Sequence, residues 1–166
     1  MKIITEQEAY LKLTALCATA EHCPYEMQQK MQRWQIDAPT QASIIARMIE
    51  ERYIDEERYA RAFVKDKILY SKWGRRKIAQ ALWMKHIDEH IQQQVLDDVD
   101  DEEYLRVLRP LIRSKQRSTR AESTYELNTK LIRFGMSRGF SVDLIKRCLQ
   151  DADDVDISDE DEGLSY

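Results

Sequence analysis

An apolar pattern recurs three times along the chain, and this periodicity limits the possible folds more than any other feature does. Five apolar positions in the first copy are matched 51 residues later in a second copy, and 53 residues after that in a third. The three sets are Met27, Met31, Ile36, Ile44 and Ile45; Ile78, Leu82, Ile87, Val95 and Leu96; and Leu131, Gly135, Phe140, Cys148 and Leu149. Gly135 alone departs from the apolar pattern. Such a period predicts small, similar units that cover one another's apolar faces.

The residue after the central apolar position is a helix-capping type in each copy. Asp37, Asp88 and Ser141 stand at this place. Their side-chain oxygens can accept a hydrogen bond from a backbone N–H in the first turn of a helix. Each unit is therefore predicted to contain a short helix, a tight turn and a capped second helix. Thr119 followed by Glu122 predicts a capping box at the start of the first helix of the third pair.

A further helix is predicted before each of these pairs. The first opens at Thr5, with Glu8 three residues later in the spacing of a capping box. The second starts near Asp55 and the third near Asp101. Pro110 lies inside the third helix and is expected to bend or break it, because an interior proline removes a hydrogen bond and clashes with the preceding turn.

Composition agrees with a helical fold. The 166 residues include only 4 Gly and 3 Pro, and so few helix breakers favour helices joined by short connections. We predict an all-α fold, an elongated curved solenoid of three tandem three-helix repeats. The repeats are expected at residues 5–53, 54–100 and 101–150.

The last sixteen residues differ from the others in charge. Residues 151–166 hold eight acidic and no basic residues, whereas residues 1–150 hold 26 basic and 22 acidic ones. The body of the chain is therefore mildly basic, although the whole chain has a net charge of -4. The tail is predicted to be disordered and solvated. The alternative is that it lies over a basic face and competes with an anionic partner.

No pattern in the sequence points to catalysis or to a bound metal. The chain has no dinucleotide-binding glycine motif, no phosphate-binding loop, no zinc-protease motif and no nucleophile elbow. His86 and His90 are four residues apart, but Asp88 between them predicts a turn, and no third ligand lies at a useful spacing. We expect neither enzymatic activity nor a cofactor.

Three further absences indicate the compartment. Cys17, Cys23 and Cys148 are odd in number and lack CxxC spacing, so neither a disulfide framework nor a zinc ribbon is expected. No apolar run reaches the ~18 residues that a membrane-spanning helix needs. The N-terminal sequence MKIITEQEAY lacks the long apolar core of a secretory signal. We therefore predict a cytoplasmic protein without a membrane span.

Two segments, residues 72–86 and 105–121, concentrate basic residues with no acid among them. The first places Arg75, Arg76 and Lys77 in the first turn of a predicted helix, where the helix dipole disfavours positive charge. This cost favours a partner whose phosphates or carboxylates meet the guanidinium groups and the free backbone N–H donors of that turn. The alternative is an ordinary solvated face. The candidate partner-binding residues are Lys72, Trp73, Arg75, Arg76, Lys77, Lys85, Arg113, Lys115 and Arg117.

Two tryptophans accompany the first basic segment. Trp73 precedes the basic turn and is expected to be partly exposed, where an aromatic ring beside arginine can stack on a base. Trp83 lies inside the predicted helix and is expected to be at least partly buried in the core. The two rings therefore predict one contact residue and one packing residue.

Residues 53–88 read YIDEERYARAFVKDKILYSKWGRRKIAQALWMKHID and resemble the core signature of the RecX family. The likeness rests on the Tyr-Ile-Asp-Glu start, the Tyr-Ala and Phe-Val pairs, Gly74 with its following arginines, and the segment from Ile78 to Ile87. It extends more weakly over residues 5–150. His86 departs from the family, which usually has glycine at this place, and Pro110 is atypical.

The resemblance implies a non-enzymatic regulator of the RecA recombinase, with a role in recombination, DNA repair and the SOS response. Members of the family lie in the helical groove of the RecA–DNA filament, contact successive RecA protomers and reduce recombinase activity. The expected partner is the RecA filament, with single- or double-stranded DNA as a further partner, and the chain is expected to be a monomer. A stand-alone nucleic-acid-binding module and a helical adaptor for another protein remain open alternatives.

Overall fold

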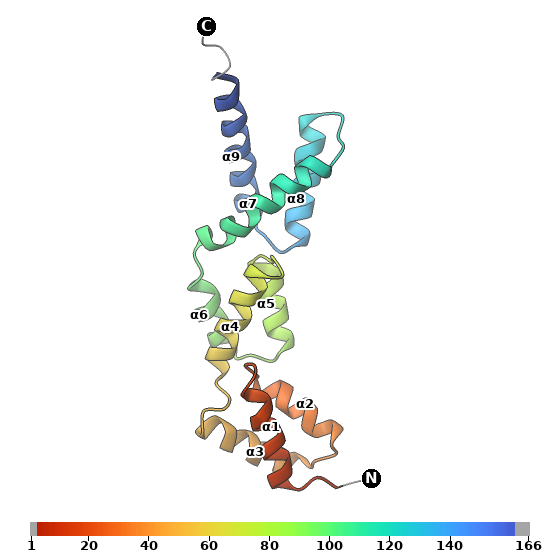
Figure 1. The fold of residues 1–166 in the computed structure, drawn as a ribbon, viewed down its shortest axis with the longest axis vertical. Helices are drawn as coiled ribbons and strands as arrows, with labels where there is room; N and C mark the ends of the chain where they lie inside the picture. The colour runs from red at the N-terminus through yellow and green to blue at the C-terminus, as the bar shows by residue number, and fades with distance from the viewer. Residues whose placement is uncertain (1–2, 162–166) are drawn as a thin grey trace. The chain divides into compact units, whose positions relative to one another are not determined.

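A computed structural model describes the backbone of residues 3–161 and the side chains of residues 3–151. Over these residues the chain forms helices joined by short turns and contains no strand (Figure 1). The helices are α1 (Glu6–Cys17), α2 (Pro24–Arg33), α3 (Ala38–Glu50), α4 (Glu56–Leu69), α5 (Arg75–Met84), α6 (Glu89–Asp97), α7 (Asp101–Ser118), α8 (Thr124–Ser137) and α9 (Val142–Asp161). The prediction of an all-helical fold is confirmed.

The chain packs as two compact units that cut across the sequence repeats. The N-terminal unit contains α1, α2, α3 and the first part of α4, up to Val64, together with Ala81–Val95. The C-terminal unit contains Lys65–Gln80 and the chain from Leu96 onward. Both α4 and α5 thus contribute residues to each unit. The repeat boundaries at residues 53 and 100 stay predictions about sequence, and each packing unit is larger than one repeat.

Apolar side chains on three helices form the core of the N-terminal unit. Leu13 of α1, Met27 and Met31 of α2, and Ile44 and Met48 of α3 are fully or almost fully buried and form one cluster. The Thr5 hydroxyl accepts a hydrogen bond from the Glu8 N–H, and the Glu8 carboxylate accepts one from the Thr5 N–H. This confirms the predicted capping box at the start of α1.

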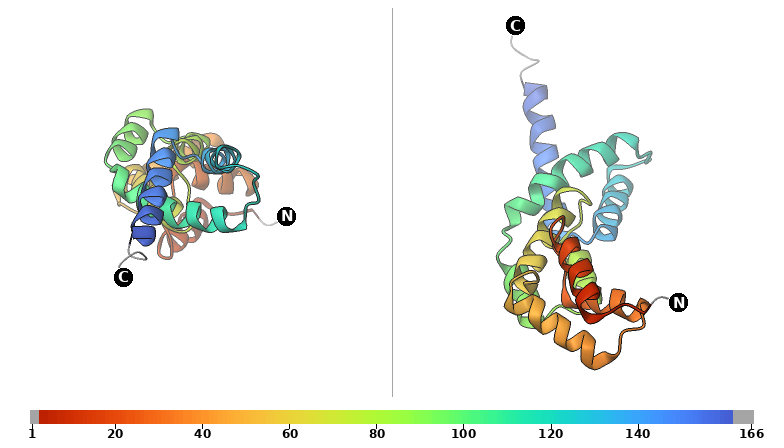
Figure 2. Two further views of the ribbon diagram at one scale, coloured as in Figure 1. Left: turned by 90° about the horizontal axis from the view of Figure 1, so that it is seen from above. Right: turned by 60° about the horizontal axis from the view of Figure 1, so that its bottom comes forward.

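Three helices of the C-terminal unit, α7, α8 and α9, pack against one another (Figure 2). Leu105, Leu108 and Ile112 of α7 are buried, as are Leu131 of α8 and Ile145 of α9. Their spacing of three and four residues along α7 places the three leucine and isoleucine side chains on one face of that helix.

The fifteen repeat positions are buried, apart from three that are half-buried. The half-buried ones are Ile36, Ile45 and Leu149. The predicted caps also hold, because the side chains of Asp37, Asp88 and Ser141 accept hydrogen bonds from first-turn N–H groups of α3, α6 and α9.

The three copies share a turn that the apolar pattern did not reveal. Gln35, His86 and Gly139, which are 51 and 53 residues apart, all have positive φ angles, of 59°, 56° and 93°. In each copy the next residue donates its N–H to a carbonyl five residues earlier, for example from Ile36 to Met31 at 3.1 Å. This is the Schellman ending of a helix, in which glycine is the usual left-handed residue.

The prediction for the start of α8 is wrong, and of the two outcomes expected at Pro110 the break does not occur. Helix α7 continues through Pro110 to Ser118 instead of breaking. Pro110 is exposed while Leu108 and Ile112 on either side of it are buried, so the apolar face of α7 packs in the core both before and after the proline. The cap of α8 is Ser123, whose hydroxyl accepts from the Glu126 N–H, and Thr119 instead ends α7.

The final helix enters the acidic segment. α9 continues past the predicted boundary at residue 150 as far as Asp161, so that segment begins as a helix. Asp151 pairs with Arg109 of α7 at 3.1 Å, which ties the first residue of the segment to the body of the C-terminal unit. The prediction of a disordered tail falls, for residues 162–166, outside the described residues.

Candidate partner-binding surface

The start of α5 lies against the turn between α8 and α9 in the C-terminal unit. The Gly74 N–H donates to the Arg138 carbonyl at 2.8 Å, and the Arg76 N–H donates to the Gly139 carbonyl at 3.2 Å. The expectation that these N–H groups are free for an anionic partner is therefore wrong at Gly74 and Arg76. The carbonyls of the turn meet donors that helix geometry leaves without an intrahelical acceptor.

Two glycines make this close approach possible. A Cβ atom at Gly74 would lie 2.5 Å from the carbonyl carbon and oxygen of Gly139, and closer still to the backbone nitrogen of Phe140. A Cβ atom at Gly139 would lie 2.5 Å from the Cβ of Lys77. Glycine at both positions lets the two backbones meet, so the basic turn is held on rigid backbone contacts.

Two of the candidate basic residues make contacts inside their own unit. The Arg75 guanidinium donates to the Asp97 carboxylate at 2.6 Å and to the Leu96 carbonyl at 3.2 Å. Lys85 pairs with Glu26 of α2 at 3.4 Å. Both side chains keep part of their surface in solvent, at 45% and 34% exposed. Their first role is to hold segments of their unit together.

Two of the remaining basic residues of the first segment, Arg76 and Lys77, line a surface depression. Lys72 and Arg76 are exposed and Lys77 is half-buried. The depression has a volume of about 300 Å³ and is lined by Arg76, Lys77, Gln80, Met136, Ser137 and Gly139. We call Lys72, Arg76 and Lys77 the α5 basic cluster. Two of its three cations, Arg76 and Lys77, line an opening that an acidic or phosphorylated group of a partner can enter.

Trp73 lies close to two ammonium groups. The Nζ atoms of Lys67 and Lys77 lie 4.8 Å and 4.7 Å from the centre of its ring system, within the range of a cation–π contact. The ring is half-buried, as the sequence predicted. Because both ammonium groups lie close to the ring, Trp73 positions cations more readily than it stacks on a base.

The second basic segment lies at the end of α7 in the same unit. Arg113, Lys115 and Arg117 are all exposed. The Lys115 Nζ lies 5.3 Å from the centre of the Phe134 ring, and the Arg138 guanidinium lies 5.4 Å from the same ring. We call Arg113, Lys115 and Arg117 the α7 basic cluster.

Arg138 was missed as a site residue, although it contacts a residue next to each cluster: Ser71, which precedes Lys72, and Phe134, which Lys115 also contacts. Its guanidinium donates to the Ser71 carbonyl at 3.3 Å, in the turn before α5, and lies beside the Phe134 ring that Lys115 also contacts. The only sequence signal was its place in the third repeat, at the position of Lys85 in the second. A repeat alignment that compared charged residues as well as apolar ones would have found it.

The prediction for Trp83 is wrong. Its side chain is 73% exposed, and the adjacent Met84 is 66% exposed. Both residues lie at the end of α5, next to the buried Leu82, and the periodicity of the helix turns them outward. They add an apolar contact area to the surface of the N-terminal unit.

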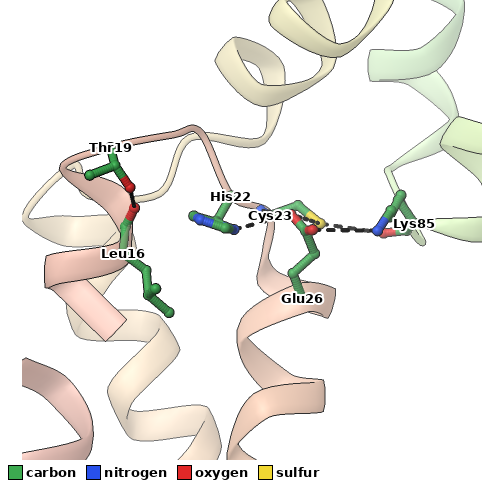
Figure 3. A network of polar contacts seen from close by, with 6 residues as sticks. All are labelled: Leu16, Thr19, His22, Cys23, Glu26 and Lys85. Atoms are coloured by element: carbon green, nitrogen blue, oxygen red, sulfur yellow. Dashed lines mark hydrogen bonds and ion pairs between the residues drawn. The ribbon is translucent and has the colours of Figure 1, made fainter. Parts of the chain in front are cut away.

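Lys85 belongs to a cluster that also contains Cys23, Glu26 and His22 (Figure 3). The Cys23 Sγ lies 3.9 Å from the Lys85 carbonyl oxygen, and Glu26 lies between Lys85 at 3.4 Å and His22 at 3.5 Å. Burial raises the pKa of the Cys23 thiol to about 11. Among the described residues no group of His, Cys, Asp and Glu side chains has the arrangement of a metal site. The side chains of this cluster pack against and pair with one another.

Thiol labelling checks this assignment. Cys17 is half-buried, whereas Cys23 and Cys148 are buried and burial raises the pKa of each thiol to about 11. The thiolate is the reactive form, so Cys17 is expected to react first with iodoacetamide at neutral pH, and the other two only slowly. Mass spectrometry of peptides sampled over time, with a urea-unfolded control, measures the order. Rapid labelling of Cys23 in the folded chain would contradict the buried cluster.

The comparisons with known proteins agree with this architecture. The model of the second three-helix domain of RecX matches residues 55–96, and the model of the third three-helix domain of RecX matches residues 101–149. These two matches cover more than half of the chain. The chain belongs to the RecX family.

Curated relatives carry the name Regulatory protein RecX. The relative from Bacillus cytotoxicus is 25% identical over 161 residues, which cover 96% of this chain and 60% of the relative. The relative from Clostridium botulinum is 30% identical over 112 residues, which cover 66% of this chain and 52% of the relative. The matched region thus spans little more than half the length of these RecX proteins.

Solved RecX structures show the same fold. RecX from Lactobacillus salivarius superposes with a TM-score of 0.81 at 21% identity, over 89% of this chain and 96% of that one. A second crystal structure of regulatory protein RecX gives a TM-score of 0.78 at 18% identity, over 87% and 71% of the two chains. None of the helices described for this chain has the length and apolar character to cross a membrane.

The departure of this chain from the RecX signature at His86 has a structural basis. His86 adopts the left-handed conformation, with φ 56°, in which glycine carries no steric cost. Its ring stacks on Tyr25, with 3.9 Å between the ring centres and 26° between the ring planes. This stacking contact holds the His86 side chain against α2.

Proposed function

We propose that this chain regulates RecA by binding in the groove of the RecA–DNA filament, where it reduces recombinase and ATPase activity without catalysing a reaction itself. Membership of the RecX family supports a regulatory role, since the curated relatives are named regulatory proteins. One observation supports a contact surface for the partner. The α5 basic cluster lies at the start of α5, which backbone contacts hold against the turn that contains Gly139, and Arg76 and Lys77 of the cluster line an open depression. The partner surface that it fits is anionic.

The binding mode is multivalent. The α5 and α7 basic clusters lie in one compact unit, so binding of one cluster raises the effective concentration of the other at the partner. Weak contacts of this kind add up on a filament, which presents the same surface on each successive protomer. A ligand in the groove then hinders filament growth and competes with other groove ligands.

Arg75 and Lys85 take a different part in this proposal from the other candidate residues. Their ion pairs with Asp97 and Glu26 hold segments of their own unit in place, so they position neighbouring residues. The proposed contact residues are Lys72, Arg76, Lys77, Arg113, Lys115 and Arg117. Trp73 acts through Lys67 and Lys77, whose ammonium groups it orients.

Reversing charge at Arg76 and Lys77 tests the proposal. The double variant Arg76→Glu/Lys77→Glu is expected to need a roughly tenfold higher concentration for half-maximal inhibition of the DNA-dependent ATPase of RecA, because it replaces attraction with repulsion. The matched control is Lys65→Glu/Lys146→Glu, which changes the same total charge at exposed positions outside both clusters. Thermal unfolding followed by circular dichroism checks that both variants fold. Unchanged inhibition by the folded double variant would remove the α5 basic cluster from the mechanism.

Binding to DNA without RecA is the second candidate function, and the same exposed cations favour it. Contacts between several lysines or arginines and phosphates make affinity fall steeply as salt rises. A salt titration with fluorescent single- and double-stranded DNA measures this slope in the absence of RecA. A chain that inhibits RecA but shows no binding to bare DNA at low salt acts through the protein filament alone.

A further inference from the structure

The depression beside the start of α5 differs from two other surface depressions in the charge of its lining. The residues that line it include two cations and no acid: Arg76, Lys77, Gln80, Met136, Ser137 and Gly139. The depression beside the α2–α3 turn holds both signs of charge, from Glu6, Asp37 and Arg33. The one at the start of α8 does so too, because it is lined by Arg120 and by two glutamates. We call the first the α5 depression, and its charge favours an anionic occupant.

The two cations of the α5 depression keep their charge available. The neighbouring Arg75 pairs with Asp97 at 2.6 Å, whereas no acidic side chain within the described part of the chain forms an ion pair with Arg76. The Lys77 Nζ lies 4.7 Å from the centre of the Trp73 ring, and this contact orients the ammonium group without neutralising it. Both cations can therefore pair with an anion from a partner.

The backbone N–H groups of this helix start are closed to an anion. The Gly74 N–H donates to the Arg138 carbonyl at 2.8 Å. The Arg76 N–H donates to the Gly139 carbonyl at 3.2 Å. The Lys77 nitrogen lies so close to Gly139 that a Cβ atom on this glycine would be 2.6 Å from it. Phosphate groups at helix starts are held by free backbone N–H groups, so an anion in the α5 depression depends on side chains instead.

Part of the lining of the α5 depression is apolar. Met136, in the last turn of α8, lines it and is 42% exposed. A methionine side chain is flexible and polarizable, so it adapts to the apolar part of a ligand. A phosphate group has no apolar part, whereas a glutamate side chain carries its carboxylate on a short hydrocarbon stem. Two cations beside an exposed methionine therefore favour a glutamate over a phosphate.

We propose that the α5 depression binds a glutamate side chain on the surface of a protein partner. The carboxylate lies against the Arg76 guanidinium, which can donate two parallel N–H bonds to its oxygens, with the Lys77 ammonium beside it. The hydrocarbon stem of the glutamate packs on Met136. This inference rests on the proposed function, because it makes the contact of the α5 basic cluster with the RecA–DNA filament a contact with protein and not with phosphates.

Methyl NMR of the full chain tests the site directly. The methionine methyl groups are labelled with carbon-13, and the Met136→Gln variant identifies the Met136 signal among those of the 6 methionines. A hexaglutamate peptide is expected to shift this signal. A single-stranded hexathymidylate of similar charge, and inorganic phosphate, are expected to leave it in place. An equal shift with hexathymidylate, or no shift with hexaglutamate, overturns the proposal.

Co-sedimentation with RecA filaments on single-stranded DNA supplies a second measurement. Met136→Gln keeps the charge of the chain and is expected to weaken binding roughly fivefold, because the glutamate stem loses its apolar contact. Leu69→Gln is the matched control, since Leu69 lies in the same unit but outside the α5 depression and is 46% exposed. Circular dichroism checks that both variants fold. Unchanged binding by Met136→Gln, or equal weakening by both variants, contradicts the glutamate site.

The two measurements together separate this inference from the proposed function. A chain that binds and inhibits RecA, but whose Met136 signal does not respond to hexaglutamate, keeps the proposed function and loses the glutamate site. A Met136 signal that responds to hexaglutamate, in a chain that does not bind RecA filaments, supports the glutamate site and overturns the proposed function.

Discussion

Replacing Gly74 with alanine is expected to destabilise the chain by about 3 kcal/mol. The added Cβ would lie 2.5 Å from the carbonyl carbon and oxygen of Gly139, and these backbone atoms cannot rotate away as a side chain can. The contact must open, and the hydrogen bonds from Gly74 to Arg138 and from Arg76 to Gly139 are lost with it. Urea unfolding followed by circular dichroism measures the loss of stability. Hydrogen exchange is expected to speed up at the amides of Gly74 and Arg76.

Two further glycine variants show whether a loss of stability in Gly74→Ala comes from the backbone contact. Gly139→Ala is expected to be comparably harmful, because φ is 93° there and the Cβ would lie 2.5 Å from the Cβ of Lys77. Gly135→Ala is the control inside α8, where the new Cβ would lie 2.5 Å and 2.7 Å from Cδ1 and Cγ1 of the buried Ile145 side chain and would meet no backbone atom of another segment. Alanine is also about 1 kcal/mol better than glycine in a helix interior, which offsets part of the cost of moving Ile145, so this variant is expected to lose less stability than Gly74→Ala. A Gly74→Ala chain as stable as the control would show that the backbones do not meet closely.

The sequence was sufficient to identify the buried positions and the helix caps because burial is periodic. Residues such as Leu82 and Leu131 have to face the core in every copy, and capping chemistry restricts the residue that starts the next helix to a few types. These local rules act within one repeat, so they can be read from a short window of sequence. The helix starts at Asp37, Asp88 and Ser141 follow from them.

Contacts between distant segments could not be read in this way. Gln35 and His86 adopt a left-handed conformation that glycine usually takes, and neither glutamine nor histidine in a sequence predicts it. Lys85 looks like a member of a basic surface until Glu26, 59 residues earlier, is placed beside it. Trp83 is predicted to be a core residue because it is large and apolar, but the orientation of α5 places its side chain in solvent. Composition identifies the charges, and only the fold decides which of them remain available to a partner.

The exception in the repeat at Gly135 leads to the second large effect. Met31, Leu82 and Gly135 occupy one position, and Gln41, Gln92 and Ile145 occupy another. In the first two repeats the glutamine side chain donates to a turn carbonyl, from Gln41 to Ile36 and from Gln92 to Ile87, at 2.7 Å in both. In the third repeat Ile145 replaces the glutamine, and its side chain fills the space over Gly135. The missing side chain at Gly135 is therefore compensated by the apolar Ile145 side chain, which takes the place of glutamine in the other two repeats.

Gly135→Leu is expected to destabilise the chain by roughly 2 kcal/mol, because a leucine cannot share this space with Ile145. Ile145→Gln in the same chain is expected to recover most of that loss, since it restores the Leu–Gln pair of the second repeat. Urea unfolding of the wild type, the two single variants and the double variant forms a double-mutant cycle, in which contacting positions show a coupling energy of roughly 1 kcal/mol or more. Additive effects would contradict the compensation. Coupling of the expected sign would show that the third repeat fills the same core position as the other two repeats. In the third repeat the side chain that fills it comes from Ile145 of α9, because Gly135 of α8 has none.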